Sequence, residues 1–211
     1  MLAEERGPAF DAWDTWRNGP DSMSMVSAAV LAASAHNTQP WRFTVGEDRI
    51  DLYADLTRST GANDVLNREL DVSLGCALEN LHLAALARGR QPEVVLVPGG
   101  SVDLVASVLL GAGSVVDGLL YRAIGSRHSN RSEYRSDPVP TSTLAAMDDL
   151  VDESVAPARL VWLTASGDRQ RFGDLLVEAR PAPTSPTTSS RRLRLRGGAA
   201  TGTRSSVTRT A

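Results

Sequence analysis

The sequence predicts an α+β protein in which helices pack on a mixed, largely antiparallel sheet. Three observations favour this class. Two short runs of alternating apolar residues flank a turn at 46–49, as in a β-hairpin. The stretch 69–88 repeats apolar residues at three- and four-residue intervals, which is typical of a helix with one buried face. Short apolar runs and helical patterns then follow up to about residue 179.

The elements follow one another in a simple order. A helix is expected over 23–35, because its apolar residues share one face and a polar run containing a proline follows. The hairpin strands should cover 41–45 and 50–54, and the polar stretch 57–67 should be a loop before the helix 69–88. The remaining expected elements are strands at 93–97, 102–110 and 158–164, and helices at 115–124, 141–152 and 168–179.

Composition narrows the class of protein. Of 211 residues 42% are apolar and 22% charged, which suffices for a real core. No apolar run approaches the roughly 18 residues of a membrane span, and the N-terminus lacks the pattern of a secretory signal. Cys76 is the single cysteine, so no internal disulfide is expected and a cytoplasmic location is favoured. No His/Cys cluster has metal-ligand spacing, so no metal site is expected.

Charge is distributed unevenly along the chain. The sequence has no lysine, and seven of its 22 arginines lie in 180–211, which holds no acidic residue. The first 179 residues therefore carry 15 arginines against 25 acidic residues. An acidic body argues against nucleic-acid binding by the folded part.

The stretch 180–211 has a different character from the rest. It contains 12 Ser/Thr, three prolines and no periodic apolar face, so it cannot bury enough surface to offset its ordering entropy. One interpretation is a basic disordered tail that contacts nucleic acid or a membrane. The interpretation that we favour is a frameshift in high-GC DNA, which would leave the chain truncated after about residue 179.

The run 32–43, Ala-Ala-Ser-Ala-His-Asn-Thr-Gln-Pro-Trp-Arg-Phe, concentrates polar groups where a helix meets a strand. Such donors and acceptors can bind the edge of a planar heterocycle. Alternatively, Ser34 and Asn37 only satisfy the helix end while Trp41 lies in the core.

This run resembles the helix–turn–strand signature of the nitroreductase superfamily, in which a serine segment leads into Asn-x-Gln-Pro-Trp. In that family the segment lies against flavin mononucleotide (FMN), near the dimer interface. The resemblance implies that Ser34, Asn37 and Gln39 contact the flavin, and that Trp41 begins the next strand. A weaker match is the helix at 73–85, preceded by Arg-Glu-Leu as in the Acg-like branch; it adds Glu79 and Asn80 as minor candidates.

A second polar run begins at Ser126. Two arginines and a serine within five positions can clamp a phosphate, although a solvated basic loop gives the same pattern. The run resembles the opening of a nitroreductase domain, Arg-x-Ser-x-Arg followed by Pro-Val-Pro and a helix. The resemblance implies that Arg127, Ser129 and Arg131 hold the flavin phosphate.

An opening motif in mid-chain implies the duplicated layout of the Acg-like branch, found in actinobacteria, with an incomplete second copy. The expected divisions are an N-terminal extension at 1–21, a first nitroreductase-like half at 22–123, the start of a second half at 124–179, and the tail 180–211. Two such chains could pair as a homodimer that replaces the missing half.

The resemblance implies an FMN-binding, NAD(P)H-dependent oxidoreductase that passes hydride through FMN to nitroaromatics, quinones or similar small molecules. No catalytic side chain is identified. No Gly-x-Gly-x-x-Gly follows a strand, so a Rossmann nucleotide site is not supported. Two alternatives stay open: a stress-associated protein that sequesters flavin without turnover, and a non-functional truncated family member.

Overall fold

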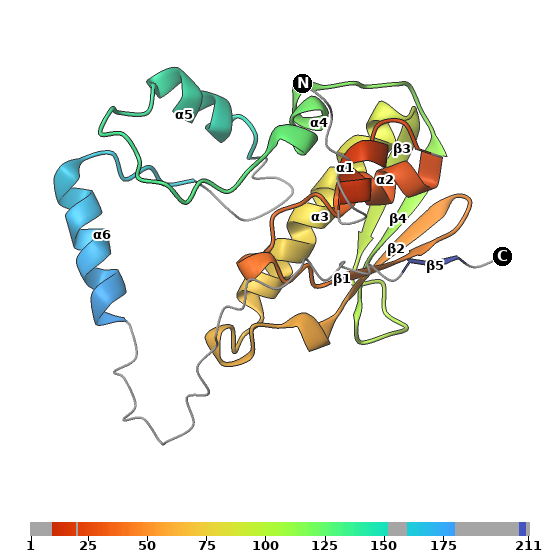
Figure 1. Cartoon of the computed structure of the whole chain (residues 1–211), viewed down its shortest axis with the longest axis horizontal. Helices are drawn as coiled ribbons and strands as arrows, with labels where there is room; N and C mark the ends of the chain where they lie inside the picture. Colours follow the sequence, from red (N-terminus) through yellow and green to blue (C-terminus); the bar gives the residue numbers. More distant parts are fainter. Residues whose placement is uncertain (1–9, 20, 152–159, 180–206, 210–211) are drawn as a thin grey trace. The chain divides into compact units, whose positions relative to one another are not determined.

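The computed structural model describes residues 10–19, 21–151, 160–179 and 207–209 (Figure 1). The chain divides into two units. The first contains the described residues up to Asn130 together with 207–209, and the second contains those from 131 to 179. All the buried residues among those described lie in the first unit.

A five-stranded sheet in the order β3-β4-β2-β1-β5 forms the centre of the first unit. The first four strands pair antiparallel, and β5 runs parallel to β1. The α+β class and the mixed, mostly antiparallel sheet are therefore confirmed. The strands are β1 (Trp41–Val45), β2 (Arg49–Ala54), β3 (Arg90–Leu96), β4 (Leu104–Ala112) and β5 (Val207–Arg209).

The β1–β2 hairpin shows why these residues form strands. Every second residue of β1 is buried, and Phe43 pairs with Leu52 across the hairpin. Successive side chains of a strand point to opposite faces, so this alternation turns one face of the hairpin into the core. Trp41, Phe43, Ile50 and Leu52 are each at most 2% exposed.

Helix α3 (Arg68–Ala87) packs against the sheet and against α2 (Asp21–Ala29) (Figure 1). Its start is fixed by Asp64, whose buried carboxylate accepts the Leu70 N–H at 3.0 Å. By length and composition alone α3 could cross a membrane, a test that core helices also pass. Seven of its residues, among them Leu74 and Leu81, are buried in the core.

The segment before α2 belongs to the same core. Helix α1 (Asp11–Thr15) leads into Trp16, which is 6% exposed. The Trp16 ring meets the Tyr121 ring of α4 (Leu119–Ala123) edge-on, with centroids 5.1 Å apart. Residues 10–19 of the expected N-terminal extension thus pack with the first unit.

Several expected boundaries are wrong. Helix α2 ends at Ala29 instead of residue 35, because Leu31 and Ala32 bond back three residues instead of four. The buried alanines that continue past this point hide the helix end in the sequence. In place of one helix at 115–124 the chain forms α4 and the short η5 (Ile124–Ser126). Of the strand expected at 158–164, residues 160–164 are described and form no strand.

The second unit contains α5 (Thr141–Asp148) and α6 (Ser166–Glu178), neither of which has a buried residue. Both helices begin close to the expected positions. Of the stretch 180–211, only 207–209 lie within the described residues.

Candidate functional site

The turn between α2 and β1, residues 34–40, has a strained backbone. His36, Asn37 and Gln39 have φ angles of +50°, +57° and +49°. These are three of the five non-glycine residues with positive φ in the described part of the chain. The left-handed conformation costs roughly 1–2 kcal/mol per non-glycine residue, so it persists only where the surroundings impose it.

Hydrogen bonds inside the turn and to α3 impose this conformation. The Ser34 hydroxyl oxygen accepts the Gln39 N–H at 3.0 Å, which closes the turn on itself. The Ala35 N–H donates to the Ser73 hydroxyl at 3.1 Å, and that hydroxyl donates to the Glu69 carbonyl at 2.6 Å. The turn is therefore fastened to the first part of α3.

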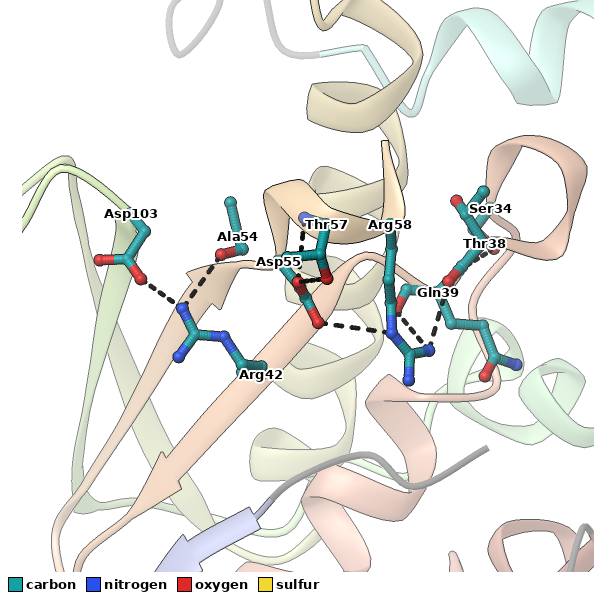
Figure 2. A network of polar contacts seen from close by, with 9 residues as sticks. All are labelled: Ser34, Thr38, Gln39, Arg42, Ala54, Asp55, Thr57, Arg58 and Asp103. Atoms are coloured by element: carbon teal, nitrogen blue, oxygen red, sulfur yellow. Dashed lines mark hydrogen bonds and ion pairs between the residues drawn. The ribbon is translucent and has the colours of Figure 1, made fainter. Parts of the chain in front are cut away.

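Arg58 also contacts the turn (Figure 2). Its Nη1 lies 3.4 Å from the carbonyl oxygens of both Thr38 and Gln39. Its Nε lies 3.4 Å from the carboxylate of Asp55, and the Asp55 N–H donates to the Pro40 carbonyl at 2.9 Å. One guanidinium thus holds two carbonyls of the strained turn to the end of β2.

The polar network continues across the hairpin to the β3–β4 loop (Figure 2). Arg42 of β1 donates to the Ala54 carbonyl at 3.3 Å and forms an ion pair with Asp103. The hydroxyl of Ser101 donates to Asp103 as well. These hydrogen bonds, that of Ser101 first and that of Arg42 second, lower the pKa of Asp103.

A hollow of about 340 Å³ lies between the turn and the start of α3. This volume is at the lower end of the range for small-molecule sites, roughly 300–1,000 Å³. Small and apolar side chains dominate the lining, with one arginine and one glutamate at the start of α3. The lining residues are Ala33, Ser34, Ala35, Arg68, Glu69, Val72, Ser73 and Cys76.

The structure places the three predicted ring contacts in this turn. Ser34 lines the hollow, but its hydroxyl is already engaged by the Gln39 N–H. Asn37 is exposed, and the side-chain amide of Gln39 points away from Arg58 (Figure 2). Trp41 is 2% exposed and lies in the core. Neither Asn37 nor Gln39 is among the residues that line the hollow, so of the three predicted ring contacts only Ser34 borders it.

The predicted phosphate contacts are divided between the units. Arg127 ends the η5 segment, and its Nη2 lies 3.4 Å from the Leu31 carbonyl, three residues before Ser34. Ser129 is exposed in the first unit, whereas Arg131 opens the second. The structure thus brings Arg127 to the α2 end of the turn.

The two minor candidates on α3 have different roles. The Asn80 amide donates to the Ala28 carbonyl at 3.0 Å and so joins α3 to α2. Glu79 is exposed. Among the described residues, no group of three His, Cys, Asp or Glu could hold a metal ion.

Arg58 contacts the turn although the sequence did not indicate it as part of the candidate site. The available signal was local: Asp55 follows β2, caps η3 (Leu56–Arg58) by accepting the Thr57 N–H, and pairs with Arg58 three residues later. This spacing predicts a local ion pair, but nothing in it indicates the contact with Thr38 and Gln39.

The chain is similar to curated proteins of Mycobacterium tuberculosis. It is 32% identical over 128 residues to "Putative NAD(P)H nitroreductase Rv3131" of strain H37Rv, covering 59% of this chain and 37% of that protein. It is 33% identical over 86 residues to "Putative NAD(P)H nitroreductase acg", covering 37% of this chain and 26% of that protein. The chain therefore spans well under half the length of these relatives.

Two further comparisons add little. No family model matches the chain. A crystal structure of a nitroreductase family protein from Streptococcus pneumoniae covers 59% of this chain and 86% of its own, with 18% identity and a TM-score of 0.33.

These names agree with the resemblance that Asn37, Gln39 and Trp41 carry in the sequence. Over its matched part, the chain is therefore similar to proteins named as nitroreductases, Acg among them.

Proposed function

We propose that this chain is an FMN-binding, NAD(P)H-dependent oxidoreductase whose flavin ring lies beside the 34–40 turn. The observation that carries the proposal is the turn itself. Three left-handed residues are held there by Ser34, Ser73 and Arg58, next to a hollow of about 340 Å³. Strain that is imposed from several sides is typical of a binding site.

The residues present suit a flavin. Small side chains in the hollow leave room for a planar ring. The amides of Asn37 and Gln39 belong to the same turn but lie outside the lining of the hollow, and we propose them as the donors and acceptors for the polar edge of the ring. Within the first unit, the guanidinium of Arg127 and the hydroxyl of Ser129 supply donors of the kind that bind phosphate. When bound, FMN supplies hydride chemistry between a reduced nicotinamide and a nitroaromatic, quinone or similar acceptor.

In this proposal the chain's own residues act by positioning. Ser34 and Arg58 fix the turn before any ligand arrives, so little ordering entropy is lost on binding. The small and apolar side chains of the hollow offer a surface to the ring, and Arg127 holds the phosphate end. Because the family signature lies near a dimer interface, the proposed assembly is a homodimer.

The test is the visible absorption spectrum of the purified full chain, with FMN released by denaturation and quantified. The expected result is near-stoichiometric FMN, and a loss of bound flavin in Asn37→Ala and Gln39→Ala. Added NAD(P)H should then bleach the flavin band, and a nitroaromatic or quinone should restore it. A chain that neither retains nor binds added FMN would contradict the proposal.

The same measurement separates flavin storage from catalysis. Bound flavin that NAD(P)H cannot bleach would favour a flavin-sequestering protein without turnover. Stoichiometric FMN therefore supports the proposed flavin site alone. Bleaching of the flavin band by NAD(P)H is needed to support the proposed oxidoreductase activity.

A further inference from the structure

Helix α1 and Trp16 contact the segment that leads directly into Arg127. The indole Nε1–H of Trp13 donates to the Gly125 carbonyl at 3.1 Å. The guanidinium of Arg17 lies over the Trp16 ring, 4.5 Å from its centroid, and donates to the Arg122 carbonyl at 3.0 Å. Trp13 and Arg17 of the N-terminal segment therefore hydrogen-bond to η5 and to the end of α4, respectively.

Gly125 permits a close approach that another residue would prevent. A Cβ at this position would lie 2.9 Å from Cζ2 and 3.0 Å from Nε1 of Trp16. Trp16 is 6% exposed and also packs on Tyr121, so its ring has little room to move. The contact between the Trp16 ring and the backbone at 125 thus fixes η5 against the core.

The N-terminal segment is itself anchored independently of η5. The hydroxyls of Thr15 and Ser27 hydrogen-bond at 3.1 Å, which ties α1 to α2. Arg88, at the end of α3, donates to the carbonyls of Arg17 at 2.6 Å and Gly19 at 3.3 Å. The segment therefore gives η5 a fixed support.

The position of Arg127 follows from that of η5. Its N–H donates to the Ala123 carbonyl at 3.0 Å, and its guanidinium reaches the Leu31 carbonyl at the end of α2. A shift of η5 would carry Arg127 away from Leu31, and so away from the turn that begins at Ser34.

We propose that Trp13 and Trp16 are positioning residues, which hold η5 so that Arg127 stands ready for the phosphate of FMN. This inference rests on the proposed function. It adds that the N-terminal segment, which carries none of the family's motifs, sets the preference for a phosphorylated flavin.

The experiment compares FMN with riboflavin, which has the same ring and no phosphate. Both are titrated into the flavin-free full chain, and binding is followed by quenching of flavin fluorescence. The parent should bind FMN more tightly. Trp13→Phe removes one hydrogen bond to Gly125 and keeps an aromatic ring, so the FMN-over-riboflavin preference should fall about three- to tenfold while riboflavin affinity stays constant.

Trp162→Phe is the matched control. It also removes one indole hydrogen bond, to Asp148 at 2.8 Å, but in the second unit. The FMN-over-riboflavin preference of Trp162→Phe should equal that of the parent. Equal preferences in Trp13→Phe and the parent, with both flavins bound, would overturn the inference and leave the proposed function intact.

Gly125→Ala keeps the test decisive if Trp13→Phe folds poorly. The added Cβ must push η5 or the Trp16 ring aside, so this variant should lose the FMN preference as well. A proportional loss of both flavins in either variant would show a general effect on folding and would overturn the positioning role. A parent that binds neither flavin would overturn the proposed function, and this inference with it.

Discussion

The 34–40 turn and the 127–129 segment each carry predicted flavin contacts, yet the structure builds them differently. The turn is strained and held by Ser34, Ser73 and Arg58. The 127–129 segment is exposed, has no residue with positive φ, and its arginine is positioned through the backbone of η5. A preformed turn suits a rigid ring, because its hydrogen-bonding groups must be aligned with the polar edge of that ring. An exposed arginine suits a phosphate, which is attracted over a longer range and tolerates small displacements.

The largest expected effect separates the two regions by stability. Arg58→Met removes the charged donor from the carbonyls of Thr38 and Gln39, and we expect it to cost about 1–3 kcal/mol of unfolding free energy. Arg127→Met changes an exposed side chain and should stay within about 0.5 kcal/mol of the parent. Urea denaturation followed by circular dichroism measures both.

Flavin binding by Arg58→Met and Arg127→Met gives a second comparison between the 34–40 turn and the 127–129 segment. Arg58→Met should weaken FMN and riboflavin to the same extent, because it loosens the turn beside which we propose that the flavin ring lies. Arg127→Met should weaken FMN alone. If Arg58→Met left the unfolding free energy unchanged, the contact of Arg58 would be a surface contact without consequence for the turn.

The sequence predicted part of this site for identifiable reasons. The alternation around Trp41 and Ile50 and the helical period through Leu74 and Leu81 are local patterns, and the structure confirms both. The Asn-x-Gln-Pro-Trp motif located the turn. The same patterns could not show that His36 and Gln39 are left-handed, since neither residue type has an intrinsic preference as strong as that of glycine.

The missing part of the site depends on contacts between distant residues. Arg58 reaches a turn about 20 residues earlier, and Trp13 reaches Gly125 across 112 residues. Neither contact leaves a periodic signal in the sequence. Gly125 resembles any loop glycine until the Trp16 ring is seen to occupy the space of its missing side chain.

A second pair of variants tests whether strain distinguishes the two regions. His36 has a φ of +50°, so His36→Gly should relieve strain and raise stability by up to about 1 kcal/mol, after the greater entropy of glycine in the unfolded chain is subtracted. His36→Val places a β-branched residue in the left-handed region and should lower stability by about 1–2 kcal/mol.

His128 provides the matched control for strain. It is exposed like His36, but it is not among the positive-φ residues, so His128→Gly has no strain to relieve and should not stabilise the protein. Thermal unfolding of the three variants against the parent gives the order. If the two glycine substitutions shifted the melting temperature equally, the left-handed conformation of the turn would not be a source of strain.

The smallest expected effect concerns Asp103, at the far end of the polar network that continues from the turn through Arg42. The folded protein lowers the pKa of this carboxyl through the Ser101 hydroxyl first and Arg42 second. A carboxyl with a lowered folded-state pKa stabilises the protein above its unfolded-state pKa, about 3.9. That contribution disappears as pH falls through the folded-state value.

Asp103→Asn should therefore melt slightly below the parent at pH 7, and the two melting curves should converge below about pH 4. Arg127 contacts only a backbone carbonyl among its described hydrogen bonds, so the difference between Arg127→Met and the parent should not change over the same pH range. A gap between Asp103→Asn and the parent that persisted at low pH would assign its effect to packing instead of charge, and the network would then end at Arg42.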